Sequence, residues 1–179
     1  MRVFTSLVVC VWMLVLMTGC EEKLKPAVSN TVVSQDLPSQ ESWKTTITMT
    51  DSGKLIAILK TGHLATYTEK QYTLFDSGVV VDFYDEFEHH TSVLTASNGR
   101  VNDLTKDLEA HGNVVVISDS GTTLKTQDLY WNNRTKKVTT PAFVDILSPT
   151  EHIQGTGFES DRGLKNYTIF KVTGQGRSE

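Results

Sequence analysis

The chain has few cysteines and prolines, and no segment in which basic residues gather. Its 179 residues include two cysteines and four prolines, and the formal net charge is −4. Cys10 and Cys20 both precede residue 21, so disulfides are excluded from the rest of the chain, which packing and strand pairing must hold together. Because there is no cluster of Lys and Arg, the sequence excludes nucleic acid as a partner.

Motifs of catalysis are also missing. There is no Gly-x-Ser-x-Gly elbow and no phosphate-binding glycine loop. A metal-binding pattern is suggested only where Glu86 and Glu88 precede His89 and His90. Neighbouring residues of a strand point to opposite faces, and 85–90 is predicted to be an exposed hairpin tip. The sequence therefore predicts no enzyme, no metal site and no cofactor.

The first residues have the layout of a secretory signal. Arg2 precedes an apolar run over 3–17, which is shorter than the roughly 20 residues of a membrane-spanning helix. Thr18-Gly19-Cys20 resembles the lipobox of bacterial lipoproteins, in which the cysteine sulfur carries a diacylglycerol. This predicts a signal peptide over 1–19 and lipid attachment at Cys20. The alternative is an uncleaved signal anchor, and both place the following residues outside the cytoplasm.

Strand signals begin after a polar segment. We expect 20–41 to be the lipidated N-terminus and linker, 42–173 a β domain, and 174–179 a flexible tail. At its start, Trp43, Thr45, Ile47 and Met49 alternate with polar residues, as on one face of a strand. Turn signals separate the later apolar runs: Ser77-Gly78, Asn98-Gly99, Gly112-Asn113, Ser120-Gly121, Asn132-Asn133, Ser148-Pro149 and Arg162-Gly163.

The β domain contains internal repeats. Leu59-Lys60-Thr61 recurs as Leu94-Thr95-Ala96, Leu124-Lys125-Thr126 and Ile153-Gln154-Gly155, and 101–108 parallels 131–138. One such unit cannot bury its own apolar face, whereas stacked units can. The repeats therefore predict an all-β fold in which two antiparallel sheets face each other, with open ends that can pair with other chains.

The order of these segments resembles a known family. Gly112-Asn113-Val114, then 121–131, then Val144-Asp145-Ile146 and Gly155-Thr156-Gly157-Phe158 are similar to LptC, a periplasmic component of lipopolysaccharide export. The resemblance implies an open, V-shaped, OstA-like β-jellyroll whose apolar interior shields lipid acyl chains. It also implies lipopolysaccharide transfer from an inner-membrane transporter, with permease and ATPase subunits, to a soluble periplasmic bridge protein.

Candidate site residues follow from this resemblance. The expected lining residues are Val79, Val81, Val114, Val116, Leu124, Leu129, Trp131, Val144, Ile146 and Phe158. The expected partner edges carry Trp43, Ile47 and Leu55 at the permease side, and Tyr167, Ile169 and Phe170 at the bridge-protein side. The alternative is a structural envelope lipoprotein with a filled β-sandwich. The expected location is the periplasmic face of the inner membrane, by a lipid anchor, with the outer membrane as the second option.

Overall fold

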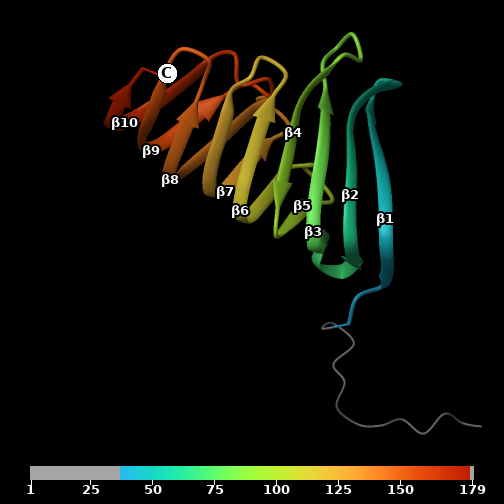
Figure 1. Ribbon diagram of the computed structural model, residues 1–179. Coiled ribbons are helices and arrows are strands. Elements are labelled where there is room, and N and C mark those ends of the chain that lie inside the picture. The colour runs from blue at the N-terminus through green and yellow to red at the C-terminus, as the bar shows by residue number, and fades with distance from the viewer. Residues whose placement is uncertain (1–36, 178–179) are drawn as a thin grey trace, which may run out of the picture. The chain divides into compact units, whose positions relative to one another are not determined.

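The computed structural model describes residues 37–177, which are built from strands joined by tight turns (Figure 1). In chain order the elements are β1 (Gln40–Asp51), β2 (Lys54–Tyr67), the 3-10 turn η2 (Thr68–Lys70), β3 (Tyr72–Tyr84), β4 (His90–Ala96), β5 (Asn98–Asn102), β6 (Leu108–Ser118), β7 (Thr123–Asn132), β8 (Lys137–Leu147), β9 (His152–Ser160) and β10 (Tyr167–Gly176). The predicted all-β class is confirmed. Over the same range, no helix has the length and apolar character needed to cross a membrane.

The strands form one continuous antiparallel sheet. Its order is β1-β2-β3-β4-β6-β7-β8-β9-β10, and β5 pairs with β3 and β6. We expected two separate sheets, but register shifts divide the long strands near their middle, for example between Thr61 and His63 and between His111 and Val114. Bulges bend a strand and increase its twist. The bulges of neighbouring strands lie side by side, and together they fold the sheet along a line that we term the crease.

The crease divides the sheet into two facing leaves. The first leaf contains 54–61, 79–84, 90–96, 114–118, 123–126, 142–147 and 152–155. The second leaf contains 63–67, 72–76, 98–102, 108–111, 129–132, 137–140 and 157–160. Because most strands run through both leaves, the hydrogen-bonded ladder continues across the fold. This agrees with the jellyroll that the family resemblance implied, built from one sheet.

Glycine and threonine shape the crease. A Cβ atom on Gly62 would lie 2.5 Å from the carbonyl oxygen of Ser77, so only glycine fits there. The Thr61 hydroxyl is 2.9 Å from the carbonyl oxygens of both His63 and Asp76. The Thr126 hydroxyl makes the equivalent pair of contacts across its own bulge, at 3.3 Å and 2.9 Å. The repeated Leu-x-Thr pattern therefore marks strands at the point where they enter the crease.

The beginning of β1 departs from the predicted alternation. Trp43 pairs with His63 whereas Thr45 pairs with Thr61, and Lys44 between them has a left-handed φ of 52°. Lys44 is thus a bulge, which resets the side-chain period. Trp43 is consequently 66 % exposed on the outer face, where its ring lies 5.1 Å from that of His63. The expectation that Trp43 shares a face with Ile47 is wrong.

Candidate functional site

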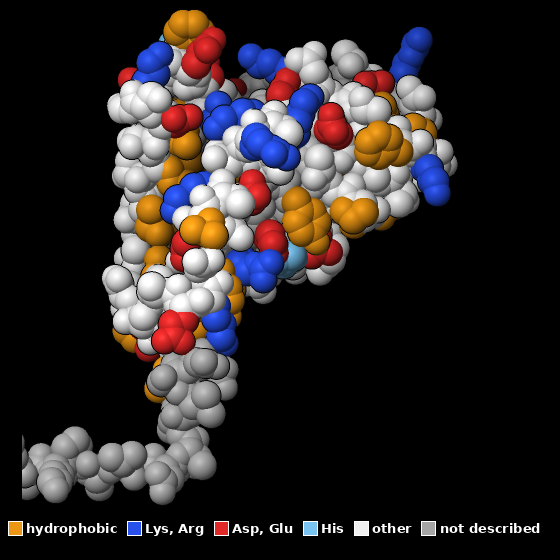
Figure 2. Space-filling view, turned by 180° about the vertical axis from the view of Figure 1, so that it is seen from behind, with side chains coloured by type: hydrophobic (Ala, Val, Ile, Leu, Met, Phe, Trp, Pro, Cys, Tyr) orange, Lys and Arg blue, Asp and Glu red, His pale blue; other side chains and the backbone are white. Residues whose placement is uncertain are grey.

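A cavity of about 650 Å³ opens between the leaves at the β1 end of the sheet. Its volume lies in the range of roughly 300–1,000 Å³ that is typical of ligand pockets. Ile47 and Met49 of β1 form one wall, and Leu108 and Trp131 of the second leaf form the opposite one. Figure 2 shows hydrophobic side chains at the β1 end of the sheet, with Lys and Arg side chains beside them. The cavity thus combines an apolar wall with a charged border.

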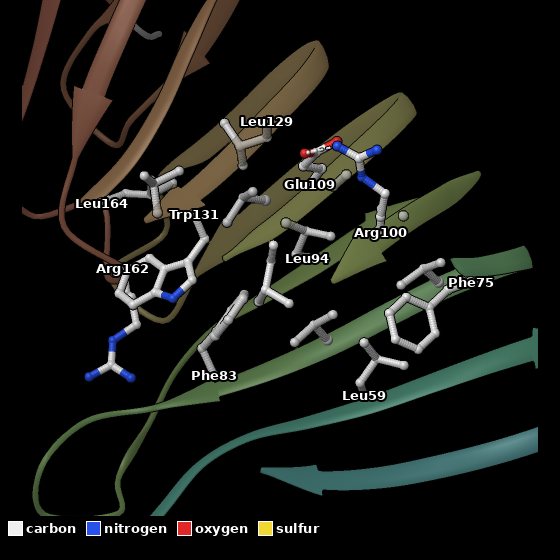
Figure 3. A pocket seen from close by; sticks show the side chains of 17 residues that line it. Leu59, Phe75, Phe83, Leu94, Arg100, Glu109, Leu129, Trp131, Arg162 and Leu164 are labelled. Atoms are coloured by element: carbon white, nitrogen blue, oxygen red, sulfur yellow. Dashed lines mark hydrogen bonds and ion pairs between the residues drawn. The ribbon is translucent and has the colours of Figure 1, made fainter. Parts of the chain in front are cut away.

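A smaller cavity of about 50 Å³ continues inward between the leaves (Figure 3). Phe75, Phe83, Leu108, Trp131 and Arg162 line both cavities and therefore stand between them. The other residues of the inner cavity are mainly aliphatic, apart from Gly99 and the ion pair of Arg100 with Glu109. This arrangement makes one apolar groove with a wide outer part and a narrow inner part.

Five of the predicted lining residues lie at this groove. Their side chains face the inner cavity: Val79, Val81, Val116, Leu129 and Trp131. The other five line neither cavity and belong to a filled core at the β10 side, where each is at most 1 % exposed: Val114, Leu124, Val144, Ile146 and Phe158. Both groups alternate inward on their strands, so the sequence pattern is the same for a cavity wall and for a packed core.

Sequence reasoning missed several groove residues. Phe83 follows Val79 and Val81 at the same two-residue period, so the strand pattern already placed it on the inner face. Met49 shares the alternation of Ile47 in β1. Arg162 was predicted only as part of a turn, and nothing in the sequence indicated that this turn reaches the groove.

Contacts between the turns of the two leaves close the fold opposite the crease. Ser92, which is fully buried in the first leaf, donates a hydrogen bond of 2.9 Å to the carbonyl oxygen of Arg162. The Tyr167 hydroxyl donates to the Glu151 carboxylate at 2.9 Å. Burial, followed by the nearby Glu151, raises the pKa of Tyr167 to about 12, so this donor keeps its proton at neutral pH. The β10 side of the groove is therefore both filled and closed.

The sheet ends at β1 and β10, each of which has one edge that pairs with no other strand of residues 37–177. Trp43 on β1 and Phe170 on β10 are each 66 % exposed. Ile47 faces the cavity instead, and Ile169 packs against the core. Leu55 lies on β2, one strand in from the edge, where it pairs with Thr50. Tyr167 begins β10 and makes the closing contact to the first leaf.

The histidines pair with carboxylates on the outer surface. His63 is bonded to Asp76 at 3.1 Å, and this hydrogen bond is the main cause that raises its pKa. His90 reaches Asp119 at 2.8 Å, whereas His89 is within 3.5 Å of Asp85. The two adjacent histidines thus have different partners. Within 37–177, no group of three or more His, Cys, Asp or Glu could hold a metal ion.

Comparison with known proteins gives one family. A family model described as "Lipopolysaccharide-assembly, LptC-related" matches residues 5–175, nearly the whole chain. No curated protein matches the chain. The folded sheet and its apolar groove agree with what that family's role requires, because a lipid carrier needs an interior that shelters acyl chains from water. The chain belongs to the LptC family, whose members are non-enzymatic, lipopolysaccharide-binding periplasmic components of the lipopolysaccharide transport system of the cell envelope.

Proposed function

We propose that the groove at the β1 end binds lipopolysaccharide through its acyl chains. The observation that carries this proposal is the 650 Å³ cavity between the leaves, walled by Ile47, Met49 and Trp131. Burial of each CH₂ group contributes about 0.8 kcal/mol, so even one acyl chain is held firmly without specific polar contacts. The open side of the groove leaves the sugars of the lipid in water.

The lipid is then passed between partners that dock at the two edges of the sheet. Unpaired strand edges bind other strands through main-chain hydrogen bonds, and β1 and β10 both provide such edges. The permease of an inner-membrane ABC transporter docks at β1, beside the wide part of the groove. The soluble bridge protein docks at β10, so the lipid enters the groove at β1 and is passed on toward the partner at β10.

Attachment to the membrane belongs to the same proposal. Cleavage before Cys20 and lipidation of its sulfur hold the domain at the periplasmic face of the inner membrane. The signal peptide over 1–19 and Cys20 both lie outside the described residues. Mass spectrometry of the mature N-terminus tests this part, because a chain that still begins at Met1 contradicts it.

A filled interior favours a second candidate function for the β10 side. Leu124 and Val144 are completely buried between the leaves there. A structural envelope lipoprotein that joins partners through its edges needs only such a packed sandwich. The two candidates differ in whether lipid enters the groove at the β1 end.

Site-specific photo-crosslinking in cells separates the two functions. A crosslinking residue at Met49 or at Trp131 faces the cavity, whereas one at Lys125 is exposed on the outer face of β7. We expect lipopolysaccharide to be captured at the two groove positions and not at Lys125. Absence of capture at both groove positions would favour the structural lipoprotein, and equal capture at Lys125 would refute binding in the groove.

A further inference from the structure

Two similar turns border the groove on the second leaf. Asn102 Oδ1 accepts from the Thr105 N–H at 3.0 Å, and Asn132 Oδ1 accepts from the Thr135 N–H at 2.9 Å. In each turn the next residue is a lysine with a left-handed φ, 62° at Lys106 and 56° at position 136. The internal repeat therefore places lysines at matching positions on adjacent hairpin tips.

Only one of these lysines has an ionic partner among the described residues. Lys136 lies 3.5 Å from the Asp51 carboxylate across the fold. Lys106 lines the large cavity and makes no ion pair with any described residue. Of the two equivalent lysines, Lys106 is therefore available to a ligand at the groove, whereas Lys136 pairs with Asp51 across the fold.

Arg162 is the second cation at the groove without an ion pair in the described part of the chain. Its guanidinium lies 5.5 Å from the centre of the Trp131 ring, a cation–π distance. Figure 3 shows this guanidinium directed away from the apolar side chains of the inner cavity. The turn that carries it is fixed by the bond from Ser92 and by Leu164, which is only 2 % exposed. Arg162 is therefore positioned where the apolar groove meets water.

The carboxylates at the same cavity are already engaged. Asp51 pairs with Lys136, and both Asp103 oxygens accept from the Thr73 hydroxyl, at 3.2 Å and 3.3 Å. Asp103 keeps its negative charge, but with Asp51 offset by Lys136 the two cations Lys106 and Arg162 outnumber it, so the net charge at the cavity is positive.

The turns of the two leaves also differ in charge. Those of the first leaf are mainly acidic: Asp51, Lys54, Asp85, Glu86, Glu88, Asp119 and Glu151. Those of the second leaf carry more cations than carboxylates: Glu69, Lys70, Asp103, Lys106, Asp107, Arg134, Lys136, Asp161, Arg162 and Lys165. An anionic group is consequently attracted to one border of the groove and repelled by the other.

We infer that Arg162 and Lys106 form a phosphate-binding subsite at the border of the groove, which holds the phosphorylated headgroup of an amphiphile while its acyl chains occupy the cavity. The inference rests on the proposed function and adds an orientation to it. The planar guanidinium binds a phosphate oxygen pair, and the lysine contributes a point charge. The headgroup lies on the second leaf because the first leaf repels it.

Binding of two lipids to the purified full chain tests the subsite. The probes are lipid A with both phosphates and the same lipid from which the phosphates have been removed. We expect Arg162→Gln to weaken binding of the phosphorylated lipid about tenfold, since a hydrogen bond to a charged group is lost. Binding of the dephosphorylated lipid should not change, and Arg162→Lys should keep part of the preference.

Lys106→Gln and Lys125→Gln are matched controls of each other. Both remove one exposed lysine that has no ion pair among the described residues, but Lys125 lies on the outer face of β7. Only Lys106→Gln should reduce the preference for the phosphorylated lipid, by about threefold as for an exposed charge. An equal effect of both variants would show general charge attraction and overturn the subsite.

The possible outcomes distinguish failure of the phosphate subsite from failure of the proposed lipid binding. A wild-type chain that binds neither lipid contradicts the proposed function. A chain that binds both lipids, with Arg162→Gln equal to wild type or weaker toward both, contradicts the phosphate subsite alone. Inorganic phosphate is the third probe: it should not displace the lipid at equal concentration, and displacement would show a site for free anions instead of a headgroup.

Discussion

Two leucines of one strand test the division of the interior into a groove and a filled core. Leu124 and Leu129 both lie on β7 and point inward, and they are 0 % and 4 % exposed. Leu124 lies in the filled core, whereas Leu129 borders the inner cavity of about 50 Å³. Truncation of each to alanine removes the same atoms, so the difference between the variants reports on their surroundings.

The expected costs differ for a physical reason. Loss of buried side-chain carbons costs about 0.8 kcal/mol for each CH₂, or roughly 2 kcal/mol in all, and both variants lose this. Leu124→Ala in addition creates a new void in a packed region, which brings the cost to about 3–5 kcal/mol. Leu129→Ala enlarges a space that exists already, so fewer packing contacts are lost and its cost remains at about 2 kcal/mol.

Urea unfolding followed by circular dichroism measures both free energies of unfolding. The leucine-to-alanine pair should differ by about 1 kcal/mol or more, with unchanged dependence on urea concentration. Equal costs would refute the division, because they would mean that Leu129 is packed as tightly as Leu124. A larger cost for Leu129→Ala would show that Leu129, and not Leu124, lies in the packed core.

Three further predictions concern the crease. Asp76 holds the pKa of His63 above 6.5, and His63 holds that of Asp76 below 3.8, so the pair stabilises the fold most between these values. This contribution is lost as pH rises through the raised pKa of His63 or falls through the lowered pKa of Asp76, so His63→Gln should be more destabilising at about pH 5.5 than at about pH 8 in urea titrations. Gly62→Ala should lower stability by about 1–3 kcal/mol because its Cβ meets backbone. Gly176→Ala, with no atom within 4 Å of the new Cβ, should be neutral in the same urea titrations. Thr126→Val should cost about 1 kcal/mol more than Thr126→Ser, which keeps the hydroxyl, and equal costs would show that the crease hydrogen bond does not contribute.

Much of the fold could be predicted from local patterns. The strand runs, the tight turn at Ser120-Gly121 and the hairpin tip at 85–90 all follow from period-two alternation and turn residues, and the structure confirms them. Ser77-Gly78 and Gly112-Asn113 were also expected to be turns, but they lie inside β3 and β6 at the crease. The same left-handed φ values serve a turn and a bulge, so the residue types alone do not separate the two.

The groove was harder to predict because it depends on distant contacts. Val81 and Val144 have the same local pattern, yet the first borders a cavity and the second is completely buried. The difference arises from which side chains face them across the fold. Arg162 lies at the groove on a turn that is bonded to Ser92, seventy positions earlier in the chain. No local pattern carries that information.

Quenching of tryptophan fluorescence by lipid tests most directly whether acyl chains enter the groove at the β1 end. The chain has three tryptophans, so substitution of two at a time by phenylalanine leaves either Trp131, at the groove, or Trp43, exposed on the outer face. Lipopolysaccharide with a spin label on its acyl chains is then added to each variant. We predict strong quenching of Trp131 and little quenching of Trp43. Equal quenching of the two, or none of Trp131, would contradict an acyl-chain site between the leaves.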